Sequence, residues 1–206
     1  MRRDADWRGS PRATTRSEFM RLLEILKPSG SDVFYDLGCG YARPCIWIAP
    51  KVKLAVGIED HYYRYLRAKK EVKKSGFSNV QILNEDIGDA TYHGATIVYS
   101  VISIGFEIIS KIQTEAERGT RIVVYGLPPF PIRSETLFGR YSMMRTPLRR
   151  VSDVDEFARI HLKKKKAAIK DLFEILEDDE KRDLKREIRN AERNWAMLKD
   201  PQRVHA

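Results

Sequence analysis

One stretch of the sequence, VFYDLGCGYARPCIWIA at residues 33–49, constrains the fold more than any other. Its apolar start is short enough to be a buried strand, and Pro44 opens a second apolar run that starts a helix. Gly38 and Gly40 lie between the two runs, where residues without side chains let the backbone turn tightly and approach a ligand closely. A strand, a glycine turn and a helix in this order are the beginning of an α/β sheet.

The alternation of strands and helices continues along the chain. Thr15 and Glu18 have the spacing of a helix-capping box, and the apolar residues that follow predict a helix to about Lys27. Four more short apolar runs and two longer helical segments follow; we expect the strands at 53–59, 80–86, 95–101 and 121–125, and the helices at 62–75 and 106–117. This order predicts an α/β fold with a doubly wound, mostly parallel sheet and helices on both faces.

The last third of the chain predicts an edge and an extension to this sheet. Residues 141–151 and 155–163 are expected to form two antiparallel strands joined by a turn at Ser152–Asp153, with Pro147 confining the first to an edge position. The tail carries a narrow apolar stripe on an otherwise charged helix, which packs on its own domain or against a second chain. We therefore expect one catalytic domain at 1–165, with a basic N-terminal arm at 1–14, and a charged helical extension at 166–206.

The net charge of +9 is concentrated in two segments. Residues 2–21 and 133–150 are rich in arginine, which indicates either contact with an anionic partner such as nucleic acid or a solvated basic surface. No apolar run reaches about 18 residues, so no membrane partner is expected. Two cysteines without a framework spacing indicate a reducing, cytoplasmic setting, and no spacing of Cys and His predicts a metal site.

Three acids follow three successive predicted strands. Asp36 precedes the glycine turn, where its carboxylate would repel a pyrophosphate and favour an amine-bearing ligand. Glu59 comes 19 residues after Gly40, where an acid accepts the hydroxyls of a ribose. Asp86 ends the third strand and can accept from an exocyclic amine. The nicotinamide-binding spacing G-x-G-x-x-G is absent, because Arg43 stands where the third glycine belongs.

The motifs DLGCG, GIE and NEDI, in this order, resemble those of class I S-adenosylmethionine (SAM)-dependent methyltransferases over about residues 14–132. The segments TTRSEFMRLLEILKPSGSDVFYDLGCG and ERGTRIVVY are similar to archaeal protein-lysine methyltransferases, relatives of the non-SET histone lysine enzymes. The resemblance implies a Rossmann-like fold, SAM as cofactor and methyl transfer to a macromolecular acceptor, in the first place a protein lysine amine. RNA methylation, and a non-catalytic binding module of the same fold, stay open as alternatives.

The resemblance also assigns roles to single residues. It implies that the acid before the glycine turn binds the methionine amine, the acid after the second strand the ribose, and the acid after the third strand, with the next backbone group, the adenine. The resemblance also implies that a threonine before the first helix closes over the cofactor. The predicted cofactor-binding set is Thr14, Tyr35, Asp36, Gly38, Gly40, Glu59, Asp60, Asp86 and Ile87.

The sequence departs from the family pattern in places that bear on the substrate. Tyr41 replaces an acid after the second glycine, where its ring either walls or fills the cofactor pocket, and Asp60 replaces an apolar residue that packs on adenine. The fourth strand lacks the Asn/Asp-Pro-Pro-aromatic motif of amino-group methylation of bases and has no cysteine for attack on cytosine. We predict that Tyr99, Ser100 and Tyr125 line a polar, uncharged acceptor pocket that holds a neutral amine.

Overall fold

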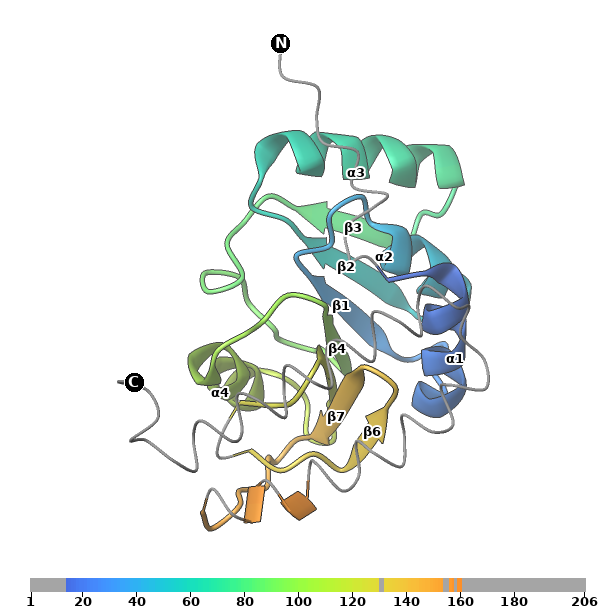
Figure 1. Ribbon diagram of the computed structural model, residues 1–206. Coiled ribbons are helices and arrows are strands. Elements are labelled where there is room, and N and C mark those ends of the chain that lie inside the picture. The colour runs from blue at the N-terminus through green and yellow to red at the C-terminus, as the bar shows by residue number, and fades with distance from the viewer. Residues whose placement is uncertain (1–13, 130–131, 154–155, 158, 161–206) are drawn as a thin grey trace, which may run out of the picture.

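The computed structural model describes residues 14–129, 132–153, 156–157 and 159–160. A seven-stranded sheet in the order β3-β2-β1-β4-β5-β7-β6 forms its centre (Figure 1). The parallel strands are β1 (Val33–Leu37), β2 (Leu54–Ile58), β3 (Val80–Leu83), β4 (Ile97–Ser100) and β5 (Arg121–Tyr125), and the antiparallel ones are β6 (Thr136–Phe138) and β7 (Tyr141–Arg145). The strand order reverses between β1 and β4, so the carboxyl end of β1 is the position where such sheets bind ligands.

Helices cover both faces of the sheet, as the alternating sequence predicts (Figure 1). They are α1 (Arg16–Leu26), α2 (Arg43–Ile48), which a short 3₁₀ turn at Ala49–Lys51 follows, α3 (Tyr62–Ser75) and α4 (Phe106–Glu115). Phe34 of β1 packs with α1 and α2 in one core, and Leu37 packs with α4 in the other, because successive side chains of a strand point to opposite faces. The prediction of a doubly wound, mostly parallel sheet is confirmed.

The start of α1 follows its predicted capping chemistry. Thr15 is the N-cap, and its hydroxyl accepts a hydrogen bond from the Glu18 backbone N–H at 3.2 Å. Phe19, Leu22, Leu23 and Leu26 are buried, and Lys27 ends the helix in a left-handed conformation. This anchored helix fixes the position of Thr14, which immediately precedes it.

The antiparallel edge is present, but its predicted composition is wrong. The strand that pairs with the outer side of β7 is β6, joined to it by a tight connection in which Gly139 has a φ of 53°. Residues 156–157 and 159–160 are helical, because the Asp153 carboxylate accepts the N–H of Glu156 at 2.8 Å, as a helix N-cap does. With β6 outside it, β7 is not the edge strand, and it ends before Pro147.

Several predictions concern residues outside the described ranges. These are the predictions of a helical extension at 166–206 and of a basic arm at 1–14, of which only Thr14 is described. The proposed domain limits depend on the same segments. Within the described residues, no helix combines the length and the apolar character that crossing a membrane requires. The same residues contain no group of three or more His, Cys, Asp or Glu side chains placed to hold a metal ion.

Candidate functional site

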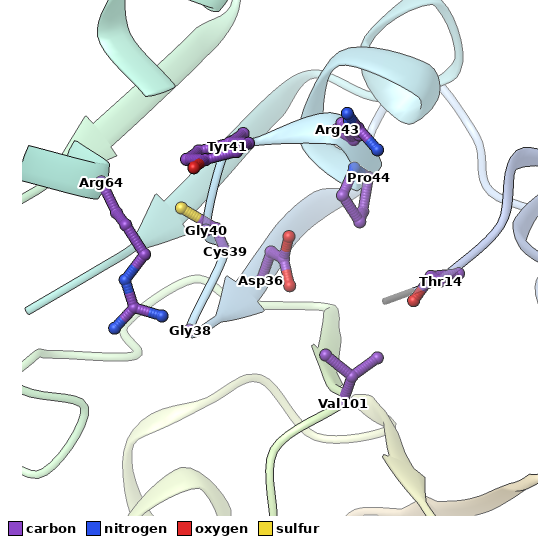
Figure 2. Close-up of a pocket in the computed structure, with 10 residues that line it drawn as sticks. All are labelled: Thr14, Asp36, Gly38, Cys39, Gly40, Tyr41, Arg43, Pro44, Arg64 and Val101. Carbon is purple, nitrogen blue, oxygen red and sulfur yellow. The ribbon is translucent and has the colours of Figure 1, made fainter. Parts of the chain in front are cut away.

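A pocket opens at the carboxyl ends of β1 and β4, beside the glycine turn (Figure 2). It has a volume of about 50 Å³, and its lining consists of Thr14, Asp36, Gly38, Cys39, Gly40, Tyr41, Arg43, Pro44, Arg64 and Val101. Figure 2 shows the Asp36 side chain between the glycine turn on one side and Thr14 on the other, with Val101 across the pocket. Segments far apart in the sequence therefore meet at the switch point of the sheet.

The glycine turn forms one wall of the pocket through its backbone. Gly38 and Gly40 have φ values of 71° and 56°, in the left-handed region that side chains disfavour. The N–H groups of Gly38 and Cys39 both donate to the carbonyl of Ile58 at 2.9 Å, which ties the turn to the end of β2. A Cβ on Gly38 would lie 3.0 Å from Ile102 Cδ1, so glycine there also permits close packing against the segment after β4.

Asp36 is a buried acid to which the described residues offer no cation. Its side chain is 1% exposed, and its one hydrogen-bond donor among the described residues is the Cys45 thiol, with Sγ 3.9 Å from Oδ2. Burial raises the pKa of Asp36 to about 8, and the nearby charge of Glu59 adds to the effect of burial. A cationic group in the pocket would stabilise the ionised carboxylate, and this makes Asp36 a candidate for binding an amine.

Glu59 lies behind the glycine turn and is 2% exposed. Its Oε2 accepts the N–H of Gly40 at 2.9 Å, while its Oε1 accepts the N–H of His61 at 3.1 Å and lies 3.0 Å from Nη2 of Arg64. Burial raises the pKa of Glu59, and these backbone and guanidinium contacts lower it by less. The carboxylate therefore joins the turn to the start of α3, and Arg64 covers it on the pocket side.

Tyr41 walls the pocket. Its ring lines the cavity, and the guanidinium carbon of Arg67 lies 5.3 Å from the ring centroid. Tyr41 is half-buried, and Figure 2 shows its ring beside the glycine turn and apart from the carboxylate of Asp36, so the ring does not take the place of a ligand at the acid. The two possibilities that the sequence left open, wall or filling, are resolved in favour of a wall.

The adenine-side residues of the predicted set lie outside this pocket lining. Asp86 is exposed, and its Oδ1 accepts the N–H of Gly88 at 2.6 Å, while the Ile87 carbonyl accepts the Tyr92 hydroxyl at 2.6 Å. Tyr35 faces the opposite side of the sheet, with its ring 5.8 Å from that of Tyr92. Asp60 is exposed, with its Oδ1 3.8 Å from Arg64 Nη2. Four of the predicted residues line the pocket: Thr14, Asp36, Gly38 and Gly40.

None of the predicted acceptor residues lines the pocket. Tyr99 is fully buried, and its hydroxyl bonds to Thr14 Oγ1 and, at 3.1 Å, to the hydroxyl of Tyr141. Ser100 donates to the carbonyl of Ile102 at 3.0 Å, and the half-buried Tyr125 packs edge-on against Tyr141. Because Thr14 does line the pocket, Tyr99 contacts the site through it. Burial raises the pKa of Tyr99 well above its ordinary value, so the hydroxyl stays protonated.

Reasoning from the sequence missed five residues of the pocket lining: Cys39, Arg43 and Pro44, which lie in or next to the glycine turn, and Arg64 and Val101, which lie elsewhere in the sequence. Val101 directly follows β4, so the rule that placed acids at strand ends could have included it. Arg64 is in the first turn of α3, and its position five residues after Glu59 follows no motif that the sequence displays. Only the helix start at Tyr62 turns this side chain back over the carboxylate.

The strand order, the glycine turn and the two buried acids place the chain among the doubly wound α/β proteins that bind a ligand at the carboxyl end of the first strand. No protein-family model matches the chain. A protein-lysine N-methyltransferase of Saccharolobus islandicus is 33% identical over 108 residues, which are 50% of this chain and 67% of the relative. An uncharacterized RNA methyltransferase of Protochlamydia amoebophila is 39% identical over 70 residues, or 34% of this chain and 16% of that protein.

Solved structures agree with this placement. The crystal structure of an RNA methyltransferase from Salinibacter ruber in complex with S-adenosyl-L-homocysteine (SAH) has a TM-score of 0.58 and 25% identity, covering 70% of this chain and 99% of that one. The chain belongs to the class I SAM-dependent methyltransferases. The predicted enzyme class and its cofactor are thereby confirmed, and the acceptor is left to be proposed.

Proposed function

We propose that this enzyme methylates a lysine amine of a protein, using SAM bound at the pocket beside β1. Buried Asp36, which has no cation of its own among the described residues, carries the cofactor part of this proposal. The similarity to the lysine methyltransferase of Saccharolobus islandicus supports the acceptor part. When bound, SAM supplies an electrophilic methyl group on a sulfonium: the amine lone pair forms the N–C bond as the C–S bond breaks, SAH leaves, and the product amine gives up a proton.

Asp36 suits the methionine end of the cofactor. A buried carboxylate needs an opposite charge nearby to stay ionised. An ammonium group beside Asp36 would supply that charge. The backbone at Gly38 and Gly40 would lie against the ligand, because no side chain projects from either residue. Thr14, held by the hydroxyls of Tyr99 and Tyr141, would close the opposite side.

The ribose end requires Arg64 to move. Nη2 of Arg64 lies 3.0 Å from Glu59 Oε1, the position that a ribose hydroxyl would take. Arg64 is at the rim, its side chain is 32% exposed, and its buried Nε has no hydrogen-bond partner among the described residues. When it swings out, Glu59 Oε1, which also accepts the His61 N–H, can accept a ribose hydroxyl, while Oε2 keeps its bond to Gly40. Asp60, Asp86 and Ile87 remain the proposed adenine-side residues.

The acceptor side would hold a lysine as a neutral amine. Methyl transfer needs little covalent help; alignment of the amine and exclusion of water supply most of the effect. Val101 gives this side of the pocket an apolar wall, and desolvation there would lower the pKa of an entering amine. Tyr125 and Ser100 remain the proposed acceptor-side residues, and Tyr99 would act as a positioning residue through Thr14.

Transfer of labelled methyl groups tests the proposal. Purified enzyme and methyl-labelled SAM would be incubated with lysine-rich proteins and, separately, with cellular RNA. We expect label in protein that survives ribonuclease, is released by protease and is identified as methyl-lysine by mass spectrometry. Asp36→Ala should abolish the label, and Glu24→Gln, which removes an exposed acid on α1, should keep it. Label confined to RNA would overturn the lysine acceptor but not the cofactor site.

RNA methylation is the second candidate, supported by the similarity to the Salinibacter ruber RNA methyltransferase. The arginine-rich segments 2–21 and 133–150 would then hold phosphates. This candidate predicts RNA binding that weakens steeply with salt, since each neutralised phosphate releases counterions. A salt-independent affinity would contradict it.

A further inference from the structure

Helix α3 presents three large apolar or aromatic side chains to solvent. Tyr62 is 57% exposed, Tyr63 72% and Leu66 45%, and Ala68 is the one residue of the helix that is fully buried. A surface helix ordinarily turns such residues toward the core. Packing therefore does not account for the two tyrosines and the leucine on this face.

The same helix carries six cations and one acid. The cations are Arg64, Arg67, Lys69, Lys70, Lys73 and Lys74. Glu71 pairs with Arg67 at 3.5 Å and with Lys74 at 3.4 Å, while Lys70 and Lys73 have no carboxylate within ion-pair range among the described residues. Favourable interaction with the helix dipole explains cations in the last turn, but not those earlier in the helix.

Helical spacing places the rings and the free lysines on one face. Tyr62, Leu66 and Lys73 fall on one row of the helix surface, and Tyr63 and Lys70 on the adjacent row. The rings of Tyr62 and Tyr63 are 6.0 Å apart at the start of the helix. From residue 62 to residue 74 the face extends about 18 Å, with its aromatic part first and its cationic part after it.

We propose that this face of α3 binds single-stranded RNA, with bases stacked on Tyr62 and Tyr63 and phosphates held by Lys70 and Lys73. Single-stranded bases have free π-faces, which a duplex buries, and base–aromatic stacking contributes about 1–3 kcal/mol per base. Cations beside the rings supply the complementary charge. Two other partners fit this face less well. An acidic protein would pair with the lysines but leave the two rings without a role. A membrane would need more apolar area than Leu66 and two tyrosines offer.

The proposed docking face adjoins the cofactor pocket but not the acceptor side. Arg64 of α3 lines the pocket, and Arg67 packs on the Tyr41 ring, which also lines it. Figure 1 shows α3 beside β3, at the far end of the sheet from β6. Since β3 and β4 are three strand spacings apart, about 14 Å separates β4 from the strand beside α3. The inference holds whichever macromolecule accepts the methyl group, because it does not use the acceptor side.

Fluorescence anisotropy with a labelled single-stranded RNA of about 12 nucleotides tests the proposal. We expect the double variant Tyr62→Ala/Tyr63→Ala to bind at least about tenfold more weakly, with an unchanged salt dependence. Lys70→Ala/Lys73→Ala should also weaken binding and lower the slope of log K against log salt by about 1.4, or 0.7 for each phosphate contact. Thermal unfolding would verify that each variant is folded. Because neither measurement requires SAM, the test does not depend on SAM binding.

The matched control is Lys51→Ala/Lys53→Ala, which removes two exposed lysines at the amino end of β2 and changes the net charge equally. It should leave RNA affinity within about twofold at constant salt. An equal loss in this control, or no loss in the tyrosine variant, would overturn the proposal in favour of a diffuse basic surface. Single-stranded DNA, duplex RNA and anionic vesicles serve as competitors; displacement by duplex or by vesicles as effectively as by single-stranded RNA would also overturn it.

Discussion

Asp32 and Asp36 lie near the two ends of the same strand, β1, and both are buried, but they have opposite surroundings. Asp32 accepts hydrogen bonds from the Ser29 N–H at 2.7 Å and from Thr96 Oγ1 at 2.7 Å, and it pairs with the Arg121 guanidinium. Among the residues that the structure describes, Asp36 has one weak thiol donor at 3.9 Å. The chain thus satisfies the acid at the amino end of the sheet and leaves the acid at the carboxyl end with almost no partner.

The difference appears in the ionisation of the two acids. Burial acts to raise the pKa of Asp32, but the hydrogen bonds from Thr96, Ser29 and Arg121 together outweigh it and hold the pKa below its ordinary value. Burial without such partners raises the pKa of Asp36 to about 8. A buried acid with partners stabilises the fold, whereas a buried acid that lines a pocket without a cation is placed to bind one. The comparison can be tested by changing each acid to its uncharged amide.

The largest expected effect is the loss of cofactor binding in Asp36→Asn. Removing one member of a buried charge pair costs about 2–5 kcal/mol of binding free energy, so SAH affinity should fall at least about 30-fold. Calorimetric titration with SAH measures it, and Glu24→Gln, an exposed acid on α1, should bind like the wild type. Unchanged affinity in Asp36→Asn would show that the methionine amine binds elsewhere.

At the amino end of β1, an amide substitution should lower stability and leave SAH affinity unchanged. Asp32→Asn leaves Arg121 and its neighbours without their carboxylate partner, which should lower the free energy of unfolding by about 1–3 kcal/mol. The amino end of the sheet is remote from the pocket, so SAH affinity should stay within about twofold of the wild type. Urea unfolding and the same titration measure the two quantities. A variant of full stability would show that the Asp32 pairing contributes little to the fold.

Much of the fold could be predicted because its local signals agree with each other. The Thr15 cap, the five parallel strands and the helix end at Gly76 all follow from spacing and capping rules, and the structure has each of them. The antiparallel edge was harder, since β6 has only three residues and such a strand has no periodicity to detect. The apolar pattern after Ser152 fits strand or helix, and the Asp153 cap decides for a helix.

The candidate site also has a part that could be predicted from the sequence and a part that could not. The rule that ligands bind at the carboxyl ends of parallel strands was enough to bring Asp36 and Glu59 to the glycine turn. Position on a strand end was not enough for Tyr99, because its environment depends on Tyr141, a residue 42 positions later whose strand pairs with β5. Arg64 likewise reaches Glu59 only through the turn that starts α3. Contacts between distant segments are what the sequence alone could not supply.

The effect most specific to the unpartnered acid, and for each pH unit smaller than the loss in Asp36→Asn, is the pH dependence of binding. In the free protein Asp36 holds its proton up to a pKa of about 8, whereas a carboxylate that accepts an ammonium must be ionised. Binding well below that pH therefore releases one proton, and SAH affinity should rise about tenfold between pH 6 and pH 7 and about fivefold between pH 7 and pH 8. Titrations in buffers of different ionisation enthalpy would count the released proton, and Asp36→Asn should show no such dependence.

The same shift fixes the sign of the stability effect. Because the folded-state pKa of Asp36 lies above the ordinary value of 3.8, the folded chain binds more protons than the unfolded chain between about pH 4 and pH 8. This acid therefore lowers stability as pH rises through that window, by up to about 1.4 kcal/mol per unit, and Asp36→Asn should gain stability relative to the wild type over the same range. Asp32, with its lowered pKa, contributes stability above its unfolded pKa and loses it as pH falls through the folded one. Urea unfolding at several pH values measures the stability of each amide variant relative to the wild type. If this difference changed in the same direction with pH for both variants, the two acids would not differ in the way their contacts indicate.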